Sequence, residues 1–241
     1  MLIAQANRLN LKAIMKKEYI LGVDDAGRGP IIGPMIIAGV LFDELASDIL
    51  KKSGVKDSKM LFPSVREKLA VDIKKLALSY EVIKIAPSEI DEAVISGFNL
   101  NKLEANKMAQ AINALTDALE KDAKITVYVD CPSNNIPAWK AVLLSYINRK
   151  EMNFKVEHKC DVNHVECSAA SVIAKVTRDE EVRKIKKQYN VNCGSGYPSD
   201  PVCVEFLKTK GAKKLEEKGL IRKSWQTWKN HKKDEEQKML F

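Results

Sequence analysis

Apolar residues follow two kinds of pattern along the chain: short continuous or alternating runs, and longer stretches in which they recur every three to four residues. The short runs are rich in Val and Ile, which is typical of β-strands. They lie at residues 19–24, 34–42, 80–86, 125–130 and 152–159. The longer stretches predict helices that bury one face, at residues 63–76, 99–119, 136–147 and 168–187.

The order of these elements indicates the fold class. A short turn with Gly and Pro separates the first two strands, which favours an antiparallel pair. The later strands are separated by helices, as parallel strands are. We therefore expect an α/β protein with a mixed five-stranded sheet flanked by helices. The predicted organisation is an N-terminal extension at 1–18, a sheet domain at 19–190 and a basic helical C-terminal region at 191–241.

Composition places the chain among globular proteins and adds a charge signal. The 241 residues are 45% hydrophobic and 30% charged, with 11 Gly and 8 Pro, which excludes wholesale disorder and fibrous repeats. The formal net charge is +8, and eleven basic residues against five acidic ones lie between Lys208 and Phe241. A basic C-terminal region is consistent with nucleic-acid binding. A solvated helical tail explains the charge equally well.

Cysteine and histidine usage favours an intracellular protein without a zinc motif. The five cysteines form no CxxC pair, and the three histidines are scattered. The sequence has no long apolar leader and no apolar run near the roughly 20 residues of a membrane span. We therefore expect a cytoplasmic protein with reduced thiols and no membrane association.

Acidic residues end or follow three of the predicted strands. Asp24 and Asp25 end the first strand, Asp130 ends the fourth, and Asp161 follows the fifth by two residues. If the fourth strand lies between the first and the fifth, these carboxylates converge, and their mutual repulsion requires bound cations. Oxygen ligands select Mg²⁺ or Mn²⁺, and two such ions about 3.5–4 Å apart stabilise in-line phosphoryl transfer. The pattern thus indicates a metal-dependent nuclease.

A simpler explanation stays open at this point. Asp favours turns, so acids are common just after strands. Successive strand residues also face opposite sides of a sheet. Asp24 and Asp25 are therefore expected to reach one metal site only if the strand ends or bulges there, a break that Gly27 favours.

The segment at 22–30, Gly-Val-Asp-Asp-Ala-Gly-Arg-Gly-Pro, resembles the signature of ribonuclease HII, and of its archaeal type in particular. Other motifs of that family follow in the expected order over residues 19–228: Lys-Asp-Ser-Lys at 56–59, Leu-Asn-Lys-Leu-Glu at 100–104, Val-Asp at 129–130, Ala-Ala-Ser-Val-Ile-Ala-Lys-Val at 169–176, Gly-Ser-Gly-Tyr-Pro-Ser-Asp-Pro at 194–201 and Arg-Lys-Ser-Trp at 222–225. An ordered set of this size is far more specific than one motif alone.

The resemblance implies the ribonuclease H fold over 19–190, followed by the helical C-terminal region. It implies cleavage of the RNA strand in RNA–DNA hybrids, and cleavage on the 5′ side of ribonucleotides embedded in duplex DNA. Two divalent ions, Mg²⁺ or Mn²⁺, would act in this reaction, which would leave a 3′-hydroxyl and a 5′-phosphate. The family's metal ligands correspond here to Asp24, Asp25, Asp130 and Asp161, and seven residues separate the last of these from the Ala-Ala-Ser segment.

Asp25 departs from the family pattern, which usually has glutamate at this position. Its side chain is one methylene shorter, so its carboxylate falls short by about one C–C bond length. Either the backbone shifts or a water bridges to the metal, and we expect activity to survive with an altered metal preference. Asp179 is a rival for the fourth ligand, but it lies well inside a predicted helix, and we interpret it as structural.

The resemblance also implies substrate contacts. Gly27, Arg28 and Gly29 match the loop whose backbone contacts the 2′-hydroxyl region of the ribonucleotide, where glycines let the main chain approach closely. Tyr197 matches the tyrosine that stacks under the sugar at the RNA–DNA junction, although alone it would be a packed turn residue. Phosphate contacts are expected from Lys56, Ser58, Lys59 and Lys175. The basic C-terminal region would add affinity without sequence choice.

The last five residues are Gln-Lys-Met-Leu-Phe. Gln237, Leu240 and Phe241 are similar to the short peptide that binds replication enzymes to the sliding clamp. The match is truncated, and an apolar end on a polar tail explains it equally well.

Two other functions fit parts of this pattern. The related type III ribonuclease usually carries a large N-terminal substrate-binding domain, and we expect none in the 18 residues before Tyr19. A non-catalytic or weakly active nucleic-acid- or clamp-binding protein would have an altered metal site, and only Asp25 favours that alternative. We expect a monomeric enzyme.

Overall fold

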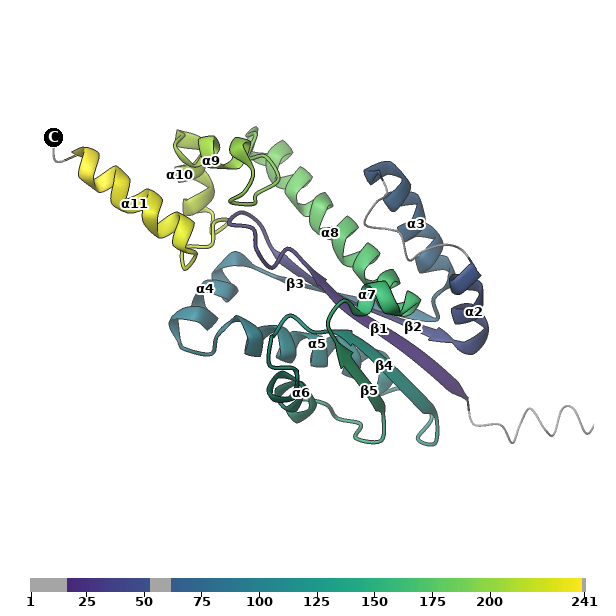
Figure 1. The fold of residues 1–241 in the computed structure, drawn as a ribbon. Helices are drawn as coiled ribbons and strands as arrows, with labels where there is room; N and C mark the ends of the chain where they lie inside the picture. Colours follow the sequence, from purple (N-terminus) through teal and green to yellow (C-terminus); the bar gives the residue numbers. More distant parts are fainter. Residues whose placement is uncertain (1–16, 53–61, 240–241) are drawn as a thin grey trace, which may run out of the picture.

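The computed structural model describes residues 17–52 and 62–239. Five strands form one mixed sheet: β1 (Glu18–Ala26), β2 (Met35–Asp43), β3 (Ser79–Ile85), β4 (Lys124–Asp130) and β5 (Asn153–Glu157). Their order is β3-β2-β1-β4-β5 (Figure 1). β2 pairs antiparallel with β1 and β3, whereas β4 pairs parallel with β1 and β5. The predicted mixed five-stranded sheet is confirmed, with β4 between the first and the fifth strand.

The helices are α2 (Glu44–Lys52), α3 (Pro63–Leu76), α4 (Pro87–Ile95), α5 (Leu100–Thr116), α6 (Ile136–Ser145), α7 (Cys160–Asn163), α8 (Val165–Tyr189), α9 (Pro201–Leu207), α10 (Lys210–Glu217) and α11 (Gln226–Met239). The four helices predicted from apolar periodicity correspond to α3, α5, α6 and α8. The prediction missed α2, α4 and α7, because a helix of nine residues or fewer is too short to show a clear period.

Helices cover both faces of the sheet (Figure 1). One face packs against α5 and α6, and the other packs against α2, α3 and α8. β2 is buried on both faces because alternate side chains enter the two clusters: Ile37 lies in the first and Ile36 in the second. β1 lies between the same two layers and is the middle strand of the sheet.

A third cluster joins the C-terminal helices to the loop that follows β1. Ile31 and Ile32 are fully buried against residues of α9, α10 and α11, including Phe206, Leu215 and Trp228. Ile32 also forms a β-bridge with Ile221. The C-terminal region therefore packs onto this glycine-rich loop, which joins β1 to β2. The domain boundaries predicted at 18/19 and 190/191 stay predictions.

None of the helices in the two described segments is long and apolar enough to cross a membrane.

A glycine sets how closely α8 approaches β1. A Cβ at Gly22 would lie 2.0 Å from the carbonyl oxygen of Glu166 and 2.5 Å from the amide nitrogen of Cys167. α8 also places Ala169 and Ala170, both fully buried, against the sheet. Small residues on both elements let the two backbones pack with almost no side chain between them.

We expect Gly22→Ala to lower the free energy of unfolding by about 3 kcal/mol or more, at or beyond the upper end of overpacking costs, because backbone atoms cannot move aside as a side chain does. Gly39→Ala is the matched control, since its Cβ would meet the end of the Leu115 side chain at 2.9 Å. Urea unfolding of the two variants measures both effects, and equal losses would contradict this explanation.

Candidate active site

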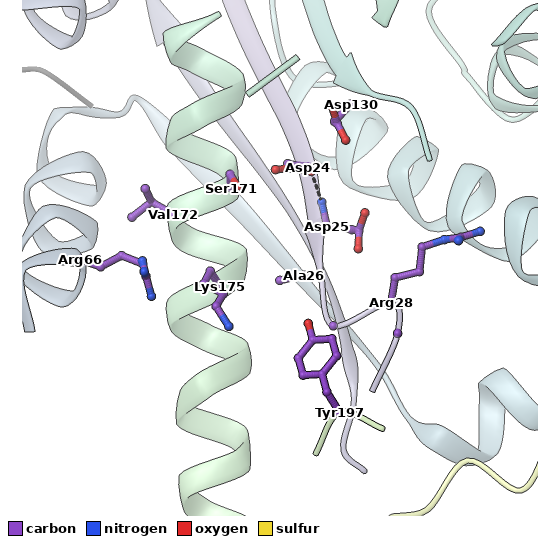
Figure 2. Close-up of a pocket in the computed structure, with 12 residues that line it drawn as sticks. Asp24, Asp25, Ala26, Arg28, Arg66, Asp130, Ser171, Val172, Lys175 and Tyr197 are labelled. Carbon is purple, nitrogen blue, oxygen red and sulfur yellow. Dashed lines mark hydrogen bonds between the residues drawn. The ribbon is translucent and has the colours of Figure 1, made fainter. Parts of the chain in front are cut away.

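A cavity of about 370 Å³ opens where the pairing of β1 with β4 ends (Figure 2). It is lined by Asp24, Asp25, Ala26, Gly27, Arg28, Gly29, Arg66, Asp130, Ser171, Val172, Lys175 and Tyr197. Three of the four predicted metal ligands therefore face one cavity, together with the predicted substrate loop and the predicted stacking tyrosine.

Asp24 and Asp25 reach this cavity from the last residues of β1. The strand ends at Ala26, directly before Gly27, as expected for two neighbouring aspartates that reach one site. It does so without a bulge, because β1 stays in regular register with β2 through Asp24↔Ala38, Asp25↔Ile37 and Ala26↔Ile36. The pairing with β4 stops at Val23↔Val129, so one edge of β1 is open beyond that point, and side chains from both faces of the sheet reach the cavity around this edge.

The electrostatics of Asp24 indicate unbalanced negative charge. Asp24 is only 5% exposed, and burial, followed by the nearby Asp25 and Asp130, raises its pKa well above the usual range. Hydrogen bonds from the Ser171 side chain and from the backbone N–H of Asp25, at 2.7 Å to Oδ1, favour the charged form but do not offset this. A divalent cation with oxygen ligands would neutralise the cluster, so these residues fit Mg²⁺ or Mn²⁺.

Asp161 occupies a different place from the other three carboxylates. It lies in the first turn of α7, is 5% exposed, and does not line the cavity. Its neighbour Cys160 donates a backbone hydrogen bond to Oδ1 of Asp130 at 2.8 Å. The fold thus brings Asp161 next to the site through α7, while its role as the fourth metal ligand stays a prediction.

Basic side chains form the wall opposite the carboxylates. Lys175 and Arg66 both line the cavity, from α8 and α3 (Figure 2). Asp179 pairs with Lys175 at 3.0 Å, with Arg178 at 3.2 Å and with Arg66 at 3.9 Å. These ion pairs agree with the structural interpretation of Asp179. Arg66 was not singled out from the sequence.

The glycine-rich loop is held in a conformation that other residues resist. Gly27 has φ +83°, and a Cβ there would lie 2.9 Å from the Pro34 carbonyl oxygen. A Cβ at Gly29 would contact the Tyr197 ring at 3.5 Å. The Arg178 guanidinium lies 4.8 Å from the centre of that ring and donates to the Ser195 carbonyl. Loop and tyrosine thus form one surface beside the carboxylates.

Two buried ionisable residues, Arg222 and Glu104, support this loop, and neither was expected from the sequence to do so. Arg222 is fully buried and donates to the carbonyl oxygens of Gly27 at 2.6 Å and Arg28 at 2.7 Å, as well as to that of Gly33. Burial lowers its pKa to about 10, which leaves it charged at neutral pH. The Arg-Lys-Ser-Trp motif at 222–225 was the sequence signal that pointed to Arg222, but the motif alone does not indicate that this arginine is buried.

Glu104 is the second. Burial and then the charge of Asp25 raise its pKa to about 8, against the opposing effect of Arg28. Arg28 Nε lies 2.9 and 3.0 Å from the two Glu104 oxygens, and its Nη2 donates to Asn101 at 2.7 Å. The side chain of Arg28 therefore ties the loop to α5.

Several predicted residues lie outside the described part of the chain: Lys56, Ser58, Lys59, Leu240 and Phe241. Gln237 is exposed near the end of α11.

The sequence matches known proteins over most of its length. Residues 21–228 match the family model described as Ribonuclease HII. A ribonuclease HII of Methanococcus maripaludis strain C6 is 38% identical over 240 residues, which cover 98% of this chain and 96% of the relative. The ribonuclease HII of Pyrococcus horikoshii is 40% identical over 208 residues, which cover 86% of this chain and 90% of the relative.

Solved structures agree with this match. The crystal structure of ribonuclease H2 from Pyrococcus horikoshii OT3 superposes with a TM-score of 0.76 at 36% identity, covering 90% of this chain and 98% of that one. The RNase HII in a PCNA:RNase HII complex from Archaeoglobus fulgidus gives 0.73 at 33% identity, covering 88% and 96%. Bst-RNase HIII in complex with Mn²⁺ gives 0.74 at 20% identity, covering 91% and 70%, and shares the fold.

The matched region contains all the described cavity residues, including the carboxylates, the glycine-rich loop and Tyr197. The chain therefore belongs to the ribonuclease HII family and is a metal-dependent hydrolase with ribonuclease H activity.

Proposed function

We propose that this enzyme cleaves the RNA strand of RNA–DNA hybrids and cuts duplex DNA on the 5′ side of embedded ribonucleotides. The observation that carries the proposal is the common cavity of Asp24, Asp25 and Asp130 with the Gly27–Gly29 loop and Tyr197. Carboxylates that suit divalent ions lie beside a backbone that suits a ribose hydroxyl. The 2′-hydroxyl is the group that distinguishes RNA from DNA at a given site.

In the proposed mechanism Asp24, Asp25, Asp130 and Asp161 would hold two divalent ions. The chemistry supplied by such ions would be activation of a water for in-line attack and stabilisation of the leaving 3′-oxygen, which would leave a 3′-hydroxyl and a 5′-phosphate. The Gly27–Gly29 backbone contacts the 2′-hydroxyl, and the Tyr197 ring stacks on the sugar. Lys175 and Arg66 face the same cavity and suit the flanking phosphates.

The direct test uses a DNA duplex that contains one ribonucleotide, incubated with and without Mg²⁺ and mapped at single-nucleotide resolution. We expect one cut, 5′ of the ribonucleotide, that depends on the metal. The all-DNA duplex of the same sequence is the control. Equal cleavage of both duplexes, or binding without cleavage, would contradict the proposal.

Tyr197→Ala is expected to lower kcat/KM on the single-ribonucleotide duplex by roughly 10- to 100-fold, because it removes the ring proposed to stack on the sugar; this loss corresponds to about 1.4–2.7 kcal/mol of transition-state stabilisation. Tyr197→Phe keeps the ring and is expected to retain most of the activity. Steady-state cleavage of the same duplex measures both variants. A loss of the same size in Tyr197→Phe would show that the hydroxyl acts instead of the ring face.

We also propose that the C-terminal residues Gln237, Leu240 and Phe241 bind a sliding clamp. The Archaeoglobus fulgidus relative has been solved as a PCNA:RNase HII complex, and Gln237 is exposed near the end of α11. Removing residues 237–241 is expected to abolish binding to an archaeal sliding clamp in surface plasmon resonance while cleavage of a free duplex is unchanged. Undiminished clamp binding by the shortened chain would contradict this contact.

A further inference from the structure

The fold brings together three side chains that the sequence spacing did not group. Glu157 ends β5, Cys160 begins α7, and His164 lies between α7 and α8. A carboxylate oxygen, the thiol sulfur and an imidazole nitrogen of these residues all lie within 4.8 Å of one another. Glu157 is paired in register with Asp130 on the neighbouring strand, so the trio is next to the active site but does not line its cavity.

The chemistry of this trio differs from that of the aspartate cavity. Thiolate and imidazole are ligands that Zn²⁺ accepts, with bonds of about 2.3 Å to sulfur and about 2.0–2.1 Å to nitrogen. Mg²⁺ prefers oxygen ligands and is not selected by a thiolate. A small inward movement of side chains that are already this close would complete three bonds to one zinc-like ion.

The three ligands are partly positioned in advance. The His164 ring stacks on Tyr128, with 3.9 Å between ring centres and 22° between planes. Its Nε2 lies 3.0 Å from Glu157 Oε1, which also accepts a hydrogen bond from the Asn163 amide at 2.9 Å. In protein metal sites, contacts of this kind orient the residues that bind the metal directly. The ion pair between His164 and Glu157 does not by itself explain why the thiol of Cys160 lies beside them.

The site also has a route to solvent. Cys160 is fully buried, whereas the side chains of His164 and Glu157 are 25% and 37% exposed. An ion can therefore enter from the exposed side and keep a water as its fourth ligand. The nearby thiol of Cys167 hydrogen-bonds to Cys160 and donates to the Val23 carbonyl oxygen at 3.3 Å, and it is not one of the three grouped side chains.

We propose that Glu157, Cys160 and His164 bind one Zn²⁺-like ion that is distinct from the ions of the aspartate cavity. Binding would fasten α7 to the end of β5. Asp161 lies between two of the ligands on this short helix, and the Cys160 backbone donates to Asp130. The ion would thus fix the segment that joins Asp161 to Asp130.

Cobalt is the probe, because Co²⁺ replaces Zn²⁺ and gives a thiolate-to-metal charge-transfer band in the near ultraviolet only when sulfur is a ligand. The full chain is titrated with Co²⁺ in excess Mg²⁺, which occupies carboxylate sites. We expect the band to saturate at one Co²⁺ per chain and to disappear when Zn²⁺ is added. No such band in the wild-type chain would overturn the proposal.

Variants locate the site. Cys160→Ala is expected to lose the band, and His164→Ala and Glu157→Gln are expected to weaken Co²⁺ binding by about tenfold or more, in line with ligand and ligand-orienting losses. Cys193→Ala, in the remote C-terminal cluster, and Asp24→Asn, in the aspartate cavity, are the controls and should keep the band. A band that survives in folded Cys160→Ala, or that is unchanged in both other ligand variants, would overturn the proposal.

Discussion

Asp130→Asn is expected to lower the rate of cleavage by about 10³-fold or more while binding of the duplex is retained. Asp130 ends β4, lines the cavity and is one of the two charges that raise the pKa of Asp24. The amide has nearly the same shape but no charge, so it removes a metal ligand and leaves the packing intact. A 10³-fold loss corresponds to about 4 kcal/mol of transition-state stabilisation.

Single-turnover cleavage and gel-shift binding of the same duplex separate the two effects. Asp72→Asn is the matched control, because this exposed residue of α3 undergoes the same chemical change away from the cavity residues. We expect wild-type cleavage from the control. Full activity of Asp130→Asn would contradict its assignment as a metal ligand, and lost binding would indicate a role in substrate affinity.

Arg222→Met is expected to lower the free energy of unfolding by about 3–5 kcal/mol and to lower cleavage with it. The guanidinium donates hydrogen bonds to the carbonyl oxygens of Gly27, Arg28 and Gly33. Each buried acceptor that loses its donor lowers the free energy of unfolding by about 1–3 kcal/mol. Methionine fills much of the same volume and supplies no donor. The loop that carries the proposed ribose contact would therefore lose its support from the C-terminal region.

The neighbouring Lys223 provides the control. Its side chain is 54% exposed, so Lys223→Met removes an adjacent positive charge at little cost. Urea unfolding measures the stability of both variants, and cleavage assays under conditions where both are folded measure the effect on activity. Equal stability of the two variants would show that Arg222 does not hold the loop.

Strands and long helices were predictable because their patterns are local. Two-residue alternation and three-to-four-residue periodicity place β1 to β5, α3, α5, α6 and α8 within a few residues of their observed ends. The convergence of Asp24 with Asp130 followed from the strand order, since acids at the ends of parallel neighbours meet at one edge. α7 was missed because it is a single turn.

The burial of the ionisable residues Arg222 and Glu104 could not be predicted from the sequence, for a physical reason. Arg222 and Glu104 look like solvent-facing residues in a chain that is 30% charged. Their burial depends on partners far away along the chain: Arg222 bonds to residues 27–33, and Glu104 bonds to Arg28. Likewise, Asp24 and Asp25 share the cavity because β4 pairing stops at Val129, which no property of β1 alone indicates.

The most direct test of the proposed metal site is a crystal of the enzyme with Mn²⁺ and an RNA–DNA duplex, in which anomalous scattering locates the ions. We expect two Mn²⁺ ions about 3.5–4 Å apart, held by Asp24, Asp25, Asp130 and Asp161 at the scissile phosphate. A duplex bound in the cavity without Mn²⁺ at these carboxylates, or with Mn²⁺ elsewhere only, would contradict the account.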